Sequence, residues 1–238
     1  MAHEQMNERQ AAAYLNISAP ELAKLASRGQ IPCRRVTGKF VFSKADLDHW
    51  VESRMSGLNG RRLAEIEEGV RAHHGMPHRQ LEVWPLIPRR GLAVPLKAKT
   101  RDGVIRDLVD LAAGGDLVLV RDKLIEEIRQ REDLCSTAIA PGVALPHPRR
   151  PLPYDITQSF LVVGLAPSGI PFGADDGSLT RLFFLICCKD ERTHLHVLAR
   201  LARMLDDRRT VEKLIASQSA EKLGELLLAS EKAAIAAD

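Results

Sequence analysis

Residues 182–202, LFFLICCKDERTHLHVLARLA, join two patterns that belong to different secondary structures. The first seven residues are an unbroken apolar run, of the length of a buried strand. A short polar break follows, and from about residue 194 the leucines recur every three or four positions, as on one face of a helix. A buried strand followed at once by an amphipathic helix indicates an α/β domain whose sheet faces are covered.

The same alternation extends in both directions from this stretch. A second apolar strand is predicted at residues 160–165. Upstream, Thr100 begins a helix that ends at Gly114, and Asp122 begins another helix as its N-cap. Two further helices, with leucines at helical spacing, complete the chain. These elements predict one α/β domain over residues 83–238.

Residues 1–55 have a different organisation, with short capped helices and a hairpin. Two pairs of residues have the spacing of a capping box, which begins a helix: Asn7 with Gln10, and Ser18 with Glu21. Strands predicted at residues 31–36 and 39–42 are joined by Thr37-Gly38, which has the composition of a turn. Two helices, a two-stranded wing and a third helix indicate a small winged helix-turn-helix domain, so the chain as a whole is α+β.

Residues 56–82 contain chain breakers at both ends and are interpreted as a linker. Three apolar residues recur at helical spacing within it: Leu63, Ile66 and Val70. A short helix is expected there, and it is a candidate element for pairing two chains. Three histidines follow: His73, His74 and His78. Because no cysteine or pair of carboxylates joins them, a flexible connector is favoured, and no metal or cofactor is predicted.

The composition excludes several classes of protein. Of 238 residues, 45% are hydrophobic and 27% charged, which excludes a disordered or collagen-like chain. The 34 basic and 31 acidic residues give a net charge of +3, so DNA binding has to be inferred from local pattern. The apolar run at 182–188 is far shorter than the ~20 residues of a membrane helix. The four cysteines lack C-x-x-C spacing and the N-terminus lacks an apolar signal core, which favours reduced thiols in the cytoplasm.

One histidine has the surroundings of a reactive group. His147 follows an apolar, strand-like run, and Arg149 lies two residues later. A neutral imidazole, with an unperturbed pKa of ~6.5, is a competent nucleophile near neutral pH. Arginine stabilises phosphoryl oxygens with a planar fork of donors, and Arg131 and Arg149 are the candidates. Of His194 and His196, which lie at i and i+2 on a helix, only one is expected to reach the site. His196 is expected to face solvent or a partner.

Three segments of the N-terminal region carry a resemblance to a known family: NERQAAAYLNIS at residues 7–18, GQIP at 29–32 and KFVFSKADLDHW at 39–50. In this order they resemble the MerR-like/excisionase DNA-binding domain, over nearly all of residues 6–54. The resemblance implies that the second helix enters the major groove and that the wing contacts the phosphate backbone. It assigns five basic residues to DNA binding: Lys24, Arg28, Arg34, Arg35 and Lys39.

Four segments of the C-terminal region carry a second resemblance: Arg131-Glu132 with Ser136-Thr137, GVALPH at 142–147, PFGADDG at 171–177 and THLHVLARLA at 193–202. They resemble enzyme IIA of the bacterial sugar phosphotransferase system, of the fructose/mannitol/nitrogen-regulatory type, over about residues 84–234. The nitrogen-regulatory branch is the most similar, especially through Thr-His-Leu-His. The resemblance implies a mixed-sheet α/β domain with helices on both faces.

The same resemblance implies roles for particular side chains. His147 would accept a phosphoryl group from a histidine phosphocarrier protein, with His194 as the supporting histidine and Arg131 as the helper arginine. Three positions depart from the family pattern, because glycine is usual at each: Ala138, Ala140 and Pro148.

Together the two regions predict a phosphotransferase-linked regulator that is a phosphohistidine carrier rather than a multiple-turnover enzyme. A phosphocarrier protein and DNA are the expected partners, and no membrane insertion is expected. Two alternatives stay open. One is a transport phosphocarrier that passes the phosphoryl group to a separate IIB domain, and the other is a non-phosphorylated adaptor linked to DNA.

Overall fold

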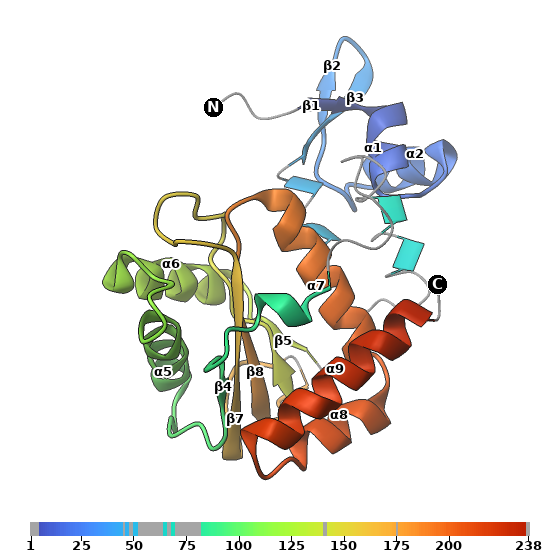
Figure 1. The fold of residues 1–238 in the computed structure, drawn as a ribbon. Helices are drawn as coiled ribbons and strands as arrows, with labels where there is room; N and C mark the ends of the chain where they lie inside the picture. The colour runs from blue at the N-terminus through green and yellow to red at the C-terminus, as the bar shows by residue number, and fades with distance from the viewer. Residues whose placement is uncertain are drawn as a thin grey trace. The chain divides into compact units, whose positions relative to one another are not determined.

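The computed structural model describes most of the chain, in these ranges: 5–44, 46–47, 50–51, 64–65, 68–69, 82–139, 142–174 and 176–236. The chain divides into two compact units, Met1–Gln80 and Leu81–Asp238. Figure 1 shows the first unit in blue and the second from green to red.

The first unit combines short helices with a small antiparallel sheet. Its elements are β1 (Gln5–Asn7), α1 (Glu8–Tyr14), α2 (Ala19–Ser27), β2 (Arg34–Val36) and β3 (Lys39–Ser43). The capping box at the start of α1 is confirmed, since Asn7 and Gln10 exchange hydrogen bonds of 2.9 and 3.0 Å. The side chain of Ser18 accepts a hydrogen bond from the N–H of Glu21 at 3.3 Å and so begins α2.

The wing has one strand more than the sequence pattern predicts. The sheet order is β1-β3-β2, and Met6 of β1 lies opposite Phe42 of β3. Both side chains are buried, so a strand of only three residues is held by packing that its own sequence does not indicate. The hairpin itself is confirmed. Thr37 and Gly38 have φ angles of +48° and +82°, the left-handed pair that a type I′ turn requires.

The second unit is built on a mixed sheet. Its elements are η2 (Trp84–Leu86), β4 (Leu92–Ala93), α5 (Arg101–Ala113), α6 (Arg121–Leu134), β5 (Ala138–Ile139), β6 (Val143–Ala144), β7 (Phe160–Ile170), β8 (Thr180–Cys187), α7 (Glu191–Leu205), α8 (Arg208–Ile215) and α9 (Ala220–Ala236). The strand order is β4-β7-β8-β6-β5. The long central pair β7–β8 is antiparallel, whereas β4 and β6 run parallel to their neighbours β7 and β8.

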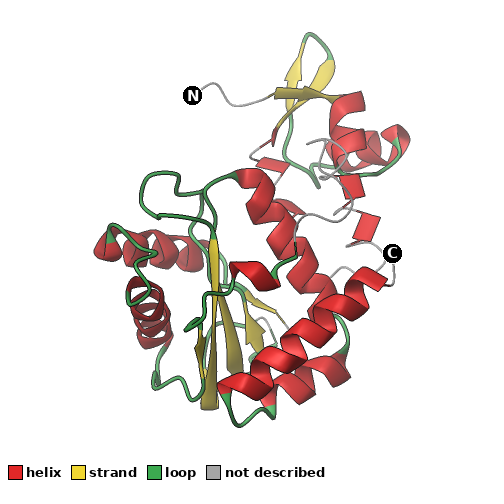
Figure 2. Cartoon of the chain, in the orientation of Figure 1, coloured by secondary structure: helices red, strands yellow, loops and turns green. Residues whose placement is uncertain are grey.

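Helices cover both faces of this sheet, as expected. Helices α5 and α6 lie on one side, and α7, α8 and α9 lie on the other (Figures 1 and 2). The first seven residues of β7 are all buried, because a strand covered on both faces has no side that can remain polar. One hydrophobic core lies between the sheet and the α5–α6 pair, with Leu108, Ile128 and Phe183 fully enclosed.

Two helix starts differ from the sequence-based prediction. Helix α6 begins at Arg121 with Val120 as N-cap and no capping side chain. Asp122 is therefore not the cap. Its carboxylate accepts a hydrogen bond from Arg121 Nη1 at 2.7 Å instead of one from a backbone N–H at the start of the helix. Helix α7 begins at Glu191, three residues before His194. The Asp190 carboxylate caps it by accepting from the N–H of Thr193 at 2.8 Å.

Gly164 in β7 provides a test of how tightly the sheet packs against α5. A Cβ atom at this position would lie 3.0 Å from Leu108 Cδ2 and from both Cδ atoms of Leu96. We expect Gly164→Ala to lower the free energy of unfolding by about 1–3 kcal/mol, the usual cost of overpacking. Urea denaturation measures it. Gly115→Ala is the control, because its Cβ would meet nothing closer than 3.5 Å; an equal loss of stability in both variants would contradict the prediction.

Within the described residues, no helix is long and apolar enough to cross a membrane, and no group of three or more His, Cys, Asp or Glu side chains is arranged to hold a metal ion. The segment predicted as a dimerisation helix is described only at residues 64–65 and 68–69, which are helical. His73, His74 and His78 lie outside the described residues.

Candidate functional site

His147 lies just beyond β6, where the chain leaves the sheet. Two backbone hydrogen bonds fix the residues just before it to neighbouring segments. The N–H of Leu145 donates to the carbonyl of Thr137 at 3.0 Å, and the N–H of Ile186 in β8 donates to the carbonyl of Pro146 at 3.0 Å. The imidazole is buried, with 3% of the residue exposed. Its position is therefore set by the sheet and not by a free loop.

The tautomer of His147 follows from one short contact. Nδ1 of the ring lies 2.7 Å from the carbonyl oxygen of Leu145. A carbonyl oxygen can only accept, so Nδ1 carries the hydrogen and donates it. In the neutral ring, the lone pair that can act as a nucleophile then belongs to Nε2.

His194 is the second histidine at this site. Its ring centroid lies 5.0 Å from that of His147, and the ring planes are tilted by 57°. The structure therefore brings together the two histidines that the sequence motifs pair. His196 is also buried, with 3% exposed, so the expectation that it faces solvent is wrong. Helix α7 is buried at every position from Thr193 to Ala202, which means that its polar side is covered as well as its apolar side.

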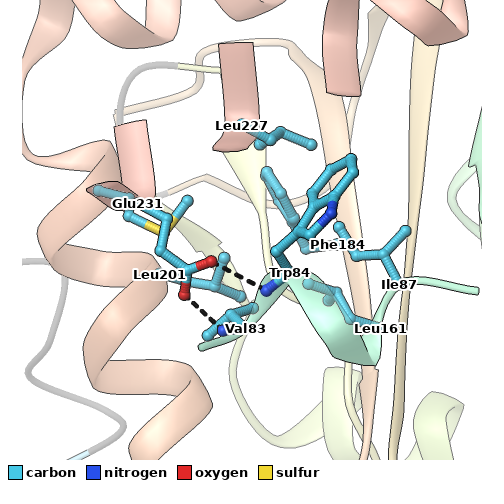
Figure 3. A pocket seen from close by; sticks show the side chains of 9 residues that line it. Val83, Trp84, Ile87, Leu161, Phe184, Leu201, Leu227 and Glu231 are labelled. Carbon is cyan, nitrogen blue, oxygen red and sulfur yellow. Dashed lines mark hydrogen bonds between the residues drawn. The ribbon is translucent and has the colours of Figure 1, made fainter. Parts of the chain in front are cut away.

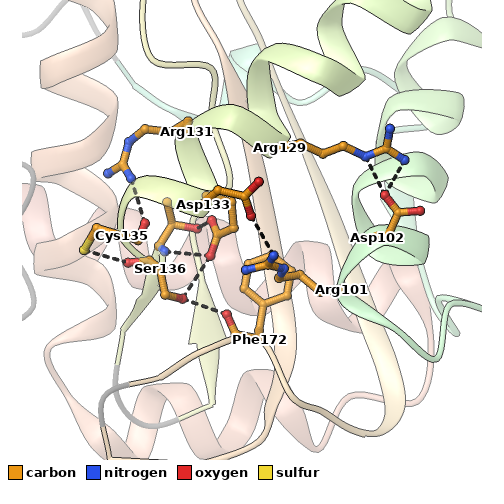
Figure 4. Close-up of polar contacts among 10 residues, drawn as sticks. Arg101, Asp102, Arg129, Arg131, Asp133, Cys135, Ser136 and Phe172 are labelled. Carbon is orange, nitrogen blue, oxygen red and sulfur yellow. Dashed lines mark hydrogen bonds and ion pairs between the residues drawn. The ribbon is translucent and has the colours of Figure 1, made fainter.

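Arg131 lies in the last turn of α6. The residue is buried, and its Nη1 donates to the carbonyl of Cys135 at 2.8 Å, as Figure 4 shows. No acceptor in the described part of the chain lies within hydrogen-bond distance of Arg131 Nε. A buried donor without an acceptor is costly, and it is the kind of group that an anion satisfies.

Glu132, next to Arg131, is buried and accepts three hydrogen bonds. Its Oε1 accepts from Ser136 Oγ and from the N–H of Thr137, both at 2.9 Å, and its Oε2 accepts from Thr137 Oγ1 at 2.6 Å. Burial raises the pKa of this carboxyl above its ordinary value, while these hydrogen bonds and the charge of Arg131 oppose the rise. Glu132 belongs to one of the motifs that carry the family resemblance, but the sequence assigned it no role; its spacing to Ser136 and Thr137 was the available signal.

The remaining positions named for this site are more peripheral. Arg149 is exposed, whereas Arg131 and the two histidines are each buried. Pro148, directly after His147, is buried. Ala138 lies in β5 opposite Ala144 of β6, and Ala140 falls outside the described residues.

The basic residues assigned to DNA all lie in the first unit, and all are exposed: Lys24, Arg28, Arg34, Arg35 and Lys39. The first lies in α2, the second at the C-terminal cap of α2, and the other three in the wing. The guanidinium of Arg35 stacks 5.0 Å above the ring of Phe40, which orders that side chain on the wing surface. The set has the exposure that contact with phosphates requires.

A small cavity elsewhere in the second unit shares no residue with this site. Figure 3 shows its mostly apolar lining, which includes Trp84, Phe184 and Leu227. At its edge the buried carboxylate of Glu231 accepts hydrogen bonds from the N–H groups of Val83 and Trp84, the latter at 2.9 Å. These contacts join α9 to the start of the second unit, so we interpret Glu231 as a residue that stabilises the fold.

Comparison with known proteins defines both units. Residues 86–230 match the family model "Phosphoenolpyruvate-dependent sugar phosphotransferase system, EIIA 2", and residues 6–55 match "Helix-turn-helix domain". The second unit is thus an EIIA-type domain, and the first is a helix-turn-helix domain. The chain belongs to the EIIA 2 family, and both sequence-based resemblances are confirmed.

Relatives include regulatory and transport proteins. A nitrogen regulatory protein of Bradyrhizobium diazoefficiens is 29% identical over 150 residues, which cover 62% of this chain and 95% of that protein. The fructose-specific EIIA component of Haloferax volcanii is 28% identical, with 61% and 94% covered. In the mannitol-specific EIICBA component of Vibrio cholerae, at 25% identity, the match covers 62% of this chain but only 22% of that protein.

Solved structures show the same fold. The nitrogen regulatory protein IIA-Ntr from Neisseria meningitidis superimposes with a TM-score of 0.55 at 22% identity, covering 61% of this chain and 98% of that one. Mannitol IIA from Escherichia coli gives a TM-score of 0.52 at 24% identity, covering 59% and 97%. At these identities the likeness supports the EIIA fold of the second unit, which confirms the predicted fold class.

Proposed function

We propose that this protein is a cytoplasmic, phosphotransferase-linked regulator, in which His147 accepts a phosphoryl group from a histidine phosphocarrier protein and the helix-turn-helix unit binds DNA. The observation that carries the first half is the bond from His147 Nδ1 to the Leu145 carbonyl, which leaves Nε2 as the nucleophile. The ring of His194 beside it supports the same role.

The transfer is an in-line displacement at phosphorus. The Nε2 lone pair of His147 forms the new N–P bond while the N–P bond of the donor breaks, and the donor nitrogen leaves with that electron pair. The acceptor ring then carries the phosphoryl group and the Nδ1 proton, and it becomes more positive. The carbonyl of Leu145, 2.7 Å from Nδ1, stabilises that charge. The donor ring keeps the hydrogen on its other nitrogen and recovers the electron pair of the broken N–P bond, so it leaves as a neutral imidazole and no proton has to pass between the two rings.

The cationic and donating groups near the acceptor serve the phosphoryl oxygens. Arg131 is buried and has an Nε donor without an acceptor in the described residues, so it is the principal anion-binding group. His194 orients the phosphoryl group. Arg149 is exposed and contributes charge where the donor approaches.

The test is direct phosphorylation of the full chain with phosphoenolpyruvate, enzyme I and the histidine phosphocarrier. Intact mass is expected to show one acid-labile phosphoryl adduct, and tandem mass spectrometry is expected to place it on His147. If the carrier becomes phosphorylated but passes nothing to this chain, the acceptor proposal is wrong. The adaptor alternative would then stand.

DNA binding is proposed on the family match of the first unit and on its exposed basic residues. Replacing Arg34, Arg35 and Lys39 together by alanine is expected to weaken binding to any duplex. The slope of log K against log salt concentration should also become less negative by about 0.9 for each phosphate that the variant no longer neutralises. Fluorescence titration of a labelled duplex over a range of salt concentrations measures both effects.

The charge-matched control replaces three exposed basic residues of the second unit by alanine: Arg208, Lys213 and Lys222. This variant has the same net charge as the wing variant. An equal fall in affinity in the two would show that binding follows net charge and not the wing.

Phosphorylation adds a charge of roughly −1.5 to −2, which we propose changes the DNA affinity of the protein or its affinity for a protein partner. Identical DNA affinities for the phosphorylated and unphosphorylated protein would exclude an effect of phosphorylation on DNA binding.

A transport role is the second candidate function of this protein. One structural relative, at 23% identity and a TM-score of 0.53, is a complex of enzyme IIAMTL with phosphorylated enzyme IIBMTL from Escherichia coli. Transfer from His147 to a separate IIB domain would support it.

A further inference from the structure

The buried carboxylate of Glu132 connects the two halves of the phosphoryl-acceptor site. It lies at the end of α6, is 2% exposed, and accepts three hydrogen bonds from the two residues that follow Cys135. Both Ser136 and Thr137 are thereby tied back to α6. No step of the transfer described above uses this carboxylate.

One arm of contacts runs from Glu132 to His147. Glu132 holds Thr137 through both its N–H and its hydroxyl. The carbonyl of Thr137 accepts the N–H of Leu145 at 3.0 Å, and the carbonyl of Leu145 accepts Nδ1–H of His147 at 2.7 Å. The two backbone carbonyls in this series, of Thr137 and of Leu145, join the carboxylate at one end to the imidazole at the other.

A second arm runs from Glu132 to Arg131. The bond from Ser136 Oγ to Glu132 fixes the residue after Cys135, and the carbonyl of Cys135 is the acceptor of Arg131 Nη1. Figure 4 shows Arg131, Cys135 and Ser136 in this arrangement. Ser136 Oγ also lies 2.7 Å from the carbonyl of Phe172 in the loop after β7, so its single hydroxyl hydrogen is shared between this oxygen and Glu132 Oε1.

We propose that Glu132 is a positioning residue for phosphoryl transfer, because it sets the Leu145 carbonyl that fixes the tautomer of His147 and the Cys135 carbonyl that orients Arg131. This inference rests on the proposed function for its consequence in transfer, but the effect on the His147 tautomer is independent of it. Without the carboxylate, the segment from Cys135 to Thr137 loses three hydrogen bonds. The two carbonyls then lose their fixed directions.

The experiment compares Glu132→Ala with Glu132→Gln in the full chain. The amide of glutamine can still accept from Ser136 and from the N–H of Thr137, and its NH₂ can donate to Thr137 Oγ1, so it is expected to restore the site. Nitrogen-15 NMR of the His147 ring reports the tautomer. Rapid-quench measurement with phosphorylated carrier reports the single-turnover rate. Glu231→Ala is the matched control, because Glu231 is an equally buried carboxylate that binds two backbone N–H groups away from the site.

In Glu132→Ala we expect a mixture of His147 tautomers and a transfer rate lower by roughly 10–100-fold, as a displacement of about 1 Å would produce. Glu132→Gln and Glu231→Ala are expected to keep the Nδ1–H tautomer and the wild-type rate. If Glu132→Ala keeps both, the inference is overturned.

The same two measurements, the tautomer and the transfer rate, also decide the case in which Glu132→Ala does not fold and the case in which the wild-type protein accepts no phosphoryl group. If Glu132→Ala does not fold, Thr137→Val removes a single hydroxyl of the first arm and is expected to shift the tautomer and the rate in the same direction; unchanged values would overturn the inference. If the wild-type protein accepts no phosphoryl group, the proposed function fails. The tautomer then decides by itself whether Glu132 positions His147.

Discussion

Replacing His147 by alanine is expected to abolish the phosphoryl adduct completely, because the atom that forms the N–P bond is removed. His147 combines two features: its Nδ1–H donates to a carbonyl, which leaves the lone pair on Nε2, and a neighbouring imidazole lies at 5.0 Å. Intact mass after incubation with the phosphoenolpyruvate-driven donor system measures the result.

His196→Gln is the control for this variant. His196 is as buried as His147, and it lies two positions from His194 on α7, which places it on a different side of the helix. This variant is expected to retain the adduct. An acid-labile adduct that survives in His147→Ala would show that another residue is the acceptor, and the assignment of the site would be wrong.

Arg131→Lys is expected to slow transfer by about 10²–10³-fold, the usual effect of removing one donor that stabilises a transition state. Lysine keeps the positive charge but lacks the planar fork, so it cannot both hold the Cys135 carbonyl and present the Nε–H that has no acceptor in the described residues. Rapid-quench kinetics with phosphorylated carrier measures the rate, and urea denaturation shows whether the fold is retained.

Arg129→Lys is the control within the same helix. Arg129 pairs with Asp102 of α5, as Figure 4 shows, and in that view no hydrogen bond or ion pair joins it to Arg131 or Cys135. A lysine can keep that pair, so the transfer rate is expected to stay at the wild-type value. If Arg131→Lys transfers as fast as Arg129→Lys, the fork of Arg131 has no part in the reaction and the anion site lies elsewhere.

Local sequence signals predicted the elements that depend on local interactions. The Asn7–Gln10 box and the Thr37-Gly38 turn form as expected, because each is decided by residues within a few positions of one another. The same reasoning failed for Asp122, where a side-chain contact with Arg121 replaced a helix cap. It also failed for β1, since a three-residue strand depends on a partner that lies far along the chain, at Val41 to Ser43.

The amino-acid sequence alone determined the class of each unit and pointed to His147 as the acceptor. Hydrophobic periodicity is a property of the chain itself, and the motif that ends at His147 is contiguous. It could not determine which nitrogen of His147 carries the hydrogen, which arginine is enclosed, or that Glu132 ties both to one turn. Those features depend on the folded second unit, in which Arg131 is buried, the Ile186 N–H fixes the Pro146 carbonyl, and the ring of His194 lies 5.0 Å from that of His147. Tertiary packing decided them, because residues distant in sequence, such as Pro146 and Ile186 or His147 and His194, meet only when the sheet and α7 are in place.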